Sequence, residues 1–135
     1  MISYRVMTDK IILTLIGLEW LAFGLIGLFN PLLIASMLEM QLGSLNAISE
    51  IRANYAFFAC MGFIALFSLW RVKLMRTAYL TFCIVLGCFL LGRILSFILD
   101  GFPSTGGLMI FVNELVVYIL AVSYTHLTLP TTSFV

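Results

Sequence analysis

The sequence has little charge. Only 10% of its 135 residues are Asp, Glu, Lys or Arg, whereas 63% are hydrophobic. A soluble domain carries about 25% charged residues, so this chain has too little polar surface for a soluble globule. Its formal net charge is +1, which gives no basis for binding nucleic acid. A single membrane domain is the natural expectation at this length.

Histidine is almost absent, and the cysteines are unpaired in sequence. Cys60, Cys83 and Cys88 lie in apolar runs and form no Cys-x-x-Cys motif, so they are interpreted as small packing residues. The only histidine, His126, lies in an atypical tail. The sequence therefore predicts no histidine-based catalysis, no metal site and no cofactor.

The tail, residues 122–135, changes character abruptly and interrupts an unfinished apolar run. It begins Val-Ser-Tyr-Thr-His-Leu-Thr-Leu-Pro-Thr, which resembles a translated sequencing adapter of the kind left by transposon-based library preparation. Residues 1–121 are therefore interpreted as a four-helix transmembrane domain, and residues 122–135 as a non-native, adapter-derived addition.

Apolar runs alternate with short connections along the chain. A membrane-spanning helix needs about 20 residues, and a short run from Pro31 to Gly43 suits an interfacial or re-entrant helix instead. Ser49 or Asn46 is the expected N-cap of the helix that follows. The pattern predicts an all-α, up-down-up-down four-helix transmembrane bundle with a short interfacial helix after the first span. The expected spans are about 11–29, 52–70, 78–99 and 108–121.

Basic residues gather on one side of the predicted bundle. Arg5 and Lys10 lie in a short polar lead and share that side with the basic loop 71–76. The positive-inside rule then places both termini on the cytoplasmic side of the cell membrane. Trp70 and Tyr79 flank the basic loop and are expected to be interfacial anchors.

Arg93 lies inside the third apolar run, where a permanent charge is costly and needs a partner. It precedes the end of that run at Leu99 by six residues, and Glu114 follows the start of the next run at Leu108 by six. Both side chains then lie at roughly 9 Å from the same surface. Because sequential antiparallel helices are usually neighbours, Arg93–Glu114 is the default pair. Glu19 is the alternative partner, or a second carboxylate that shares Arg93.

Small and polar residues recur at helical spacing beside these charges. Gly17, Gly24, Gly27 and Gly62 would let membrane helices approach closely. The outer half of the bundle is expected to hold a polar cluster, whereas the inner half is almost wholly apolar. The cluster consists of Glu19, Glu50, Arg52, Tyr55, Arg93, Ser96, Asp100 and Glu114.

Three motifs carry a resemblance to a known family. The segment 50–55, Glu-Ile-Arg-Ala-Asn-Tyr, resembles the Glu-x-Arg-Ala-x-Tyr-Gly pattern of the bacterial membrane family called domain of unknown function 4345. Segment 92–101 and Glu114-Leu115 resemble its second and third motifs, and Phe23-Gly24 with Asn30-Pro31 also fits. Ala56 departs from the pattern, where the family usually has glycine. The resemblance implies four helices and a polar outer cluster, with no assigned activity. The layout is similar to that of the DoxX-like group, some members of which are linked to redox or quinone systems.

The cluster supports two interpretations. It either fixes helix order and register as a buried ion-pair network, or lines a pocket that binds a small or lipid-like ligand. The absence of a nucleophile or cofactor motif favours a non-enzymatic membrane protein. The alternative is a subunit acting on a quinone or similar lipid-soluble substrate, with Glu19 or Glu114 handling protons. Ion or proton transport is a third hypothesis, disfavoured because only one half is polar. The bilayer is the expected partner, and a homo-oligomer stays open.

Overall fold

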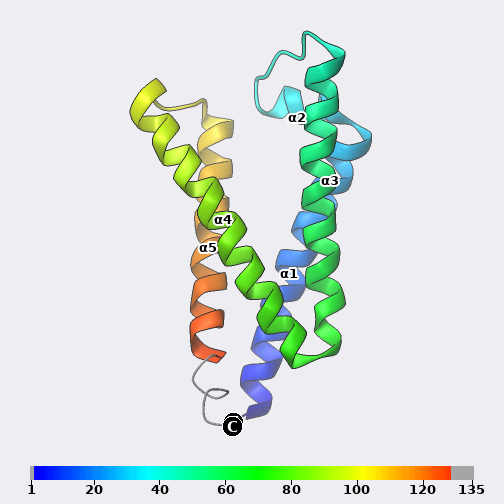
Figure 1. Cartoon of the computed structure of the whole chain (residues 1–135), viewed down its shortest axis with the longest axis vertical. Coiled ribbons are helices and arrows are strands. Elements are labelled where there is room, and N and C mark those ends of the chain that lie inside the picture. Colours follow the sequence, from blue (N-terminus) through cyan, green and yellow to red (C-terminus); the bar gives the residue numbers. More distant parts are fainter. Residues whose placement is uncertain (1, 129–135) are drawn as a thin grey trace.

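The computed structural model describes residues 2–128, with side chains described from residue 4 to residue 125. The described chain is all α, and its four long helices run alternately up and down (Figure 1). Each of the four is long and apolar enough to cross a membrane, which confirms the predicted four-span architecture. The elements are α1 (Ile2–Phe29), α2 (Pro31–Met37), α3 (Leu45–Phe67), the 3-10 turn η1 (Ser68–Trp70), α4 (Val72–Asp100) and α5 (Thr105–Thr128).

The long helices extend beyond the apolar runs that predicted them. α1 already begins at Ile2, inside the expected polar lead. A helix pairs the backbone N–H and C=O groups with each other, which is favoured near a bilayer, where water is scarce. α3 begins at Leu45 with Ser44 as its N-cap, and the Ser44 hydroxyl accepts a 3.2 Å hydrogen bond from the Ala47 N–H. The prediction of Asn46 or Ser49 as cap was therefore wrong, since both residues lie inside the helix.

The short helix α2 follows α1 after a one-residue break. The Asn30 side chain accepts a 3.3 Å hydrogen bond from the Leu33 N–H, and Pro31 occupies the first turn. Ile34 of α2 is buried and clusters with Ile51 of α3, which places α2 against the end of the bundle where α3 begins. The helix ends at Met37, well short of the expected limit at Gly43.

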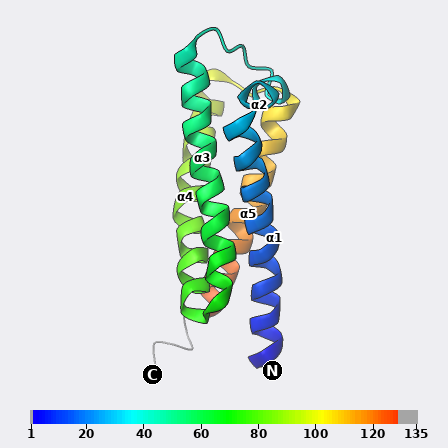
Figure 2. The same cartoon turned by 90° about the vertical axis from the view of Figure 1, so that its right-hand side faces the viewer.

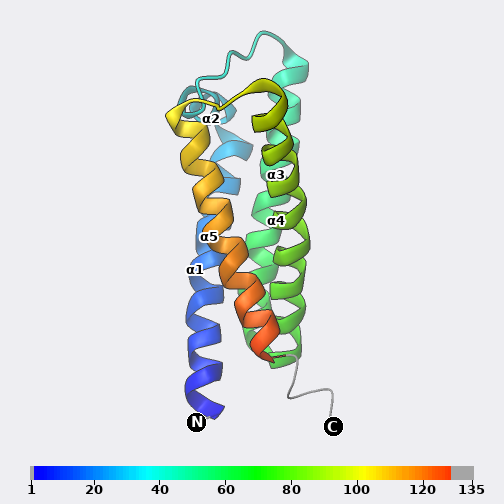
Figure 3. The same cartoon turned by 90° about the vertical axis from the view of Figure 1, so that its left-hand side faces the viewer.

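The bundle consists of two closely packed helix pairs. α1 packs most extensively on α3, and α4 on α5, while contacts between the pairs are fewer. The α1–α3 pair depends on glycine: a Cβ added at Gly24 would overlap the backbone of Ala59, and one at Gly62 would overlap the backbone of Leu21. These contacts confirm the predicted use of small residues for close approach. Figures 2 and 3 show the two pairs from the sides.

The main hydrophobic core lies at the end of the bundle that carries the predicted basic loop, 71–76, of which residues 72–76 belong to α4. Tyr79 is fully buried there, its hydroxyl donates a 2.5 Å hydrogen bond to the Asp9 carbonyl, and its ring stacks on Tyr124. The prediction of Tyr79 as an interfacial anchor was wrong, because its helix face points into the bundle. Trp70 is 83% exposed beside the same loop. The buried core residues are Leu13, Ile16, Trp20, Met61, Ala65, Met75, Ala78, Tyr79, Phe82, Leu86, Val117 and Ala121.

α5 continues through Ala121 and ends at Thr128. Residues 129–135, the rest of the adapter-like segment, lie outside the described residues. The division expected after Ala121 stays a prediction.

Candidate functional site

Arg93 of α4 and Glu114 of α5 form a bidentate ion pair. The Arg93 Nε donates to Glu114 Oε2 at 2.6 Å, and an Arg93 Nη donates to Glu114 Oε1 at 2.8 Å. Two parallel charge-assisted bonds hold both groups in a fixed geometry. The pair that equal depth predicted is therefore present.

The two partners differ in burial. The Glu114 side chain is 8% exposed, whereas that of Arg93 is 39% exposed. Arg93 lies about two turns before α4 ends at Asp100, so its long side chain can keep part of its guanidinium near the polar membrane surface. The buried Glu114 carboxylate does not reach the surface in this way, so it depends on Arg93 to neutralise its charge.

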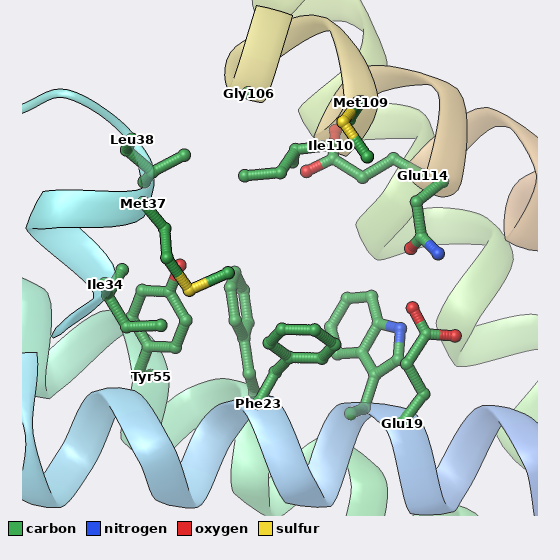
Figure 4. Close-up of a pocket in the computed structure, with 13 residues that line it drawn as sticks. Glu19, Phe23, Ile34, Met37, Leu38, Tyr55, Gly106, Met109, Ile110 and Glu114 are labelled. Carbon is green, nitrogen blue, oxygen red and sulfur yellow. The ribbon is translucent and has the colours of Figure 1, made fainter.

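A cavity of about 510 Å³ lies between the two helix pairs in the half of the bundle that carries α2. Figure 1 shows the pairs diverging toward the end that carries α2, and Figure 4 shows the side chains that line the space. Its volume falls within the range of small-molecule sites, roughly 300–1,000 Å³. The lining residues are Glu19, Trp20 and Phe23 of α1; Ile34, Met37 and Leu38 at α2; Tyr55 and Phe58 of α3; and Gly106, Met109, Ile110, Asn113 and Glu114 of α5.

Three of the predicted cluster residues meet at this cavity. Glu19 and Glu114 project from opposite walls, α1 and α5, and Tyr55 of α3 lies toward α2 (Figure 4). A Cβ at Gly27 would overlap the Tyr55 ring, so the absence of a side chain on α1 makes the room in which Tyr55 lies. Tyr55 is also within electrostatic range of both members of the ion pair.

The other five predicted residues do not line the cavity, and of these Arg93 is joined by its ion pair to Glu114, which does. Arg52 donates a 2.5 Å hydrogen bond to the Leu28 carbonyl, one of the last carbonyls of α1, which have no partner within the helix. Ser96 and Asp100 are both exposed and hydrogen-bond to each other at 3.3 Å. Glu50 is exposed at the start of α3. The structure thus brings Glu19, Tyr55, Arg93 and Glu114 together and leaves Glu50, Arg52, Ser96 and Asp100 at the surface.

Apart from Tyr55, the aromatic residues of this region were not among the residues predicted for the polar cluster. Trp20 does pack edge-on against Phe58 and Phe82, with ring centroids 5.0 Å apart in both pairs. Trp20 and Phe58 also line the cavity, as does Asn113. Asn113 could have been found from its position beside Glu114. The contribution of the α2 residues to the cavity could not be predicted from the sequence, because their position depends on how the chain turns after Asn30.

The arrangement has a counterpart in a known family. A family model described as Domain of unknown function (DUF4345) matches residues 8–125. The chain belongs to this family. The DUF4345 match spans all four long helices and every residue of the cavity, and it confirms the resemblance carried by the three motifs. No curated protein and no solved structure matches the chain.

The chain is thus a small multi-span membrane protein of a family without an assigned activity. Among the described residues, no group of three or more His, Cys, Asp or Glu side chains could hold a metal ion.

Proposed function

We propose that this protein binds a small, largely apolar molecule in the cavity between its two helix pairs. The observation that carries the proposal is the cavity itself: about 510 Å³, lined mainly by aromatic and aliphatic side chains with a few polar groups. Protein sites for small ligands have this composition, in which apolar walls give affinity and a few polar groups give orientation. The Arg93–Glu114 pair then fixes the register of α4 on α5 and with it the position of one cavity wall.

We further propose that the cavity lies in the outer half of a bacterial inner-membrane protein. The basic residues Arg5, Lys10, Arg71, Lys73 and Arg76 belong to the opposite end of the bundle, which the positive-inside rule assigns to the cytoplasm. In this orientation, a ligand would reach the cavity from the outer side of the membrane or from the outer leaflet.

The proposal can be tested with a neutral fluorescent probe. The chain has two tryptophans, of which Trp20 lines the cavity and Trp70 is exposed at the other end. In the Trp70→Phe variant in lipid nanodiscs, Trp20 should transfer its excitation energy to N-phenylnaphthylamine in a saturable manner. Empty nanodiscs and a titration of free tryptophan provide the correction for dye dissolved in lipid.

A cavity-filling variant and its matched control make the test specific. Ile110→Phe adds volume inside the cavity and should weaken saturable transfer, whereas Ile119→Phe makes the same change on an exposed part of the same helix and should not. Met37→Phe fills the cavity from α2 and serves as a second variant in case the first does not fold. Transfer that never saturates, or that is equal in all folded variants, would contradict binding in this cavity.

A further inference from the structure

The two carboxylates of the cavity differ in their charge balance. Both oxygens of Glu114 accept hydrogen bonds from Arg93, at 2.6 and 2.8 Å. For the Glu19 carboxylate, by contrast, no hydrogen bond or ion pair is found within the part of the chain whose side chains the structure describes, residues 4–125. No lysine or arginine lines the cavity. The cavity therefore holds one neutralised carboxylate and one that lacks a positive partner.

The surroundings of Glu19 suit a positive charge. Trp20 and Phe23 follow it on the same helix, and Tyr55 and Phe58 line the cavity from α3. Aromatic ring faces attract cations, most strongly where water is excluded. A carboxylate in an apolar environment is also costly unless it is paired, so a cationic ligand supplies what Glu19 lacks.

The remaining walls suit an apolar body. Ile34, Met37, Met109 and Ile110 line the cavity on the sides of α2 and α5. Methionine side chains adapt to ligands of varied shape. An anion is disfavoured, because it would face Glu19, while Arg93 is already engaged by the cavity-lining Glu114.

We infer that the cavity selects apolar cations, such as lipophilic amines or phosphonium ions, and that Glu19 is the counter-charge which binds them. The inference rests on the proposed function and assigns its ligand class. The Arg93–Glu114 pair contributes by keeping Arg93 from neutralising Glu19. The cavity thus selects cations because Arg93 pairs with Glu114 and leaves Glu19 without a positive partner.

Two ions of matched shape and opposite charge test the selectivity. Tetraphenylphosphonium and tetraphenylborate are each titrated against N-phenylnaphthylamine bound to the Trp70→Phe protein in nanodiscs, with displacement followed by Trp20 energy transfer. After correction for partition into empty nanodiscs, the phosphonium should displace the dye at concentrations at least about tenfold lower than the borate.

Charge-removing variants assign the effect to one residue. Glu19→Gln should weaken phosphonium binding about tenfold and abolish the preference over the borate, while dye binding is retained. Glu50→Gln removes the same charge from an exposed position outside the cavity and should leave the preference intact.

The outcomes separate this inference from the proposed function. Equal displacement of the dye by both ions, or an unchanged preference in Glu19→Gln, would overturn cation selectivity. The proposed binding in the cavity would still hold if dye binding were saturable and were weakened by Ile110→Phe. If the dye itself showed no saturable binding, the proposed function would fall and the inference with it.

Discussion

At the scale of single residues, the Arg93–Glu114 pair joins α4 to α5 in the half of the bundle that contains the cavity. A charge placed in a membrane helix is tolerated when it has a partner, and here the partner comes from the next helix in a two-bond geometry. Removing one member of such a pair is far more costly than replacing both, because the remaining charge is left unpaired. The pair therefore specifies how α4 and α5 align more than it adds to net stability.

Arg93→Met should destabilise the protein by on the order of 3 kcal/mol, because Glu114 is left buried without a partner. The double variant Arg93→Met, Glu114→Met should lose less than the single variant. Arg93→Lys should fall between wild type and Arg93→Met, since lysine keeps the charge but not the planar fork. Circular dichroism during SDS titration in mixed micelles measures these differences. Additive losses in the double variant would show that the pair is not coupled.

At the scale of helices, the two interhelical pairs are built differently. α1 and α3 meet through glycine, with Gly24 and Gly62 each against the facing backbone, whereas α4 and α5 are also joined by an ion pair. Close backbone approach gains dispersion energy but leaves no room for adjustment. The α1–α3 pair is consequently the more rigid wall of the cavity.

Gly24→Ala should therefore destabilise the protein by about 1–3 kcal/mol, the range for overpacking a filled interface. Gly92→Ala is the matched control, because Gly92 is also helical but has open space where the Cβ would lie. It should be neutral or slightly stabilising, by less than about 1 kcal/mol. The same SDS titration compares the two. Equal effects of both substitutions would argue against glycine-dependent contact between α1 and α3.

The N-cap of α3 gives a second test at this scale. Ser44→Ala removes the hydroxyl that accepts the Ala47 N–H and should cost about 1 kcal/mol. Ser49→Ala makes the same change within the first turns of the helix and should be nearly neutral. Thermal unfolding followed by circular dichroism measures both. A greater loss in Ser49→Ala would instead favour a helix that starts later.

The helices and the Arg93–Glu114 ion pair could be predicted from the sequence, because each depends on the positions of residues within one apolar run or on either side of one loop. Apolar length defines a span, and residue counts from a shared loop define depth, which is how Arg93 and Glu114 were matched. Helix faces were harder to assign. At 100° per residue, Arg93 lies within about 60° of Ser96 and about 20° of Asp100 around the helix, so periodicity alone places the three on one face. In the structure Arg93 pairs with Glu114 of α5, whereas Ser96 and Asp100 are exposed nearer the end of α4.

The cavity was not predictable in detail from the sequence. It forms where α2, α5 and the α1–α3 pair meet, and these elements are distant in the chain. Tyr79 shows the same limit: an aromatic residue beside a basic loop resembles an interfacial anchor, but its hydroxyl finds the Asp9 carbonyl seventy residues earlier. Only tertiary packing distinguishes the two environments.

At the scale of the whole molecule, the two ends of the bundle have different characters. The end near the basic loop is filled by the main hydrophobic core, and the opposite end contains the cavity and α2. This polarity follows the sequence, in which intramembrane charges occur toward one side only. A single orientation in the membrane would give these two ends distinct roles.

The proposed orientation predicts a pattern of chemical labelling. In a variant whose native cysteines are replaced by alanine, Gly43→Cys should react with a membrane-impermeant maleimide applied to spheroplasts. Gly43 is exposed in the loop before α3, with nothing near its Cα. Lys73→Cys, beside the basic loop, should react only after permeabilisation. The reverse pattern would place the cavity in the cytoplasmic half.

The division of the bundle into two helix pairs also bears on how the chain could be cut. Residues 2–67 contain both members of one pair and residues 72–128 both members of the other, so each pair is continuous in sequence. The short turn between them, 68–71, joins the two pairs, with Ser68 buried and Leu69 packed against the core. Two polypeptides interrupted at that turn and produced in one cell should reassemble, and a tag on one half should recover the other. Arg93→Met should not prevent this recovery, because the ion pair lies entirely within the second half.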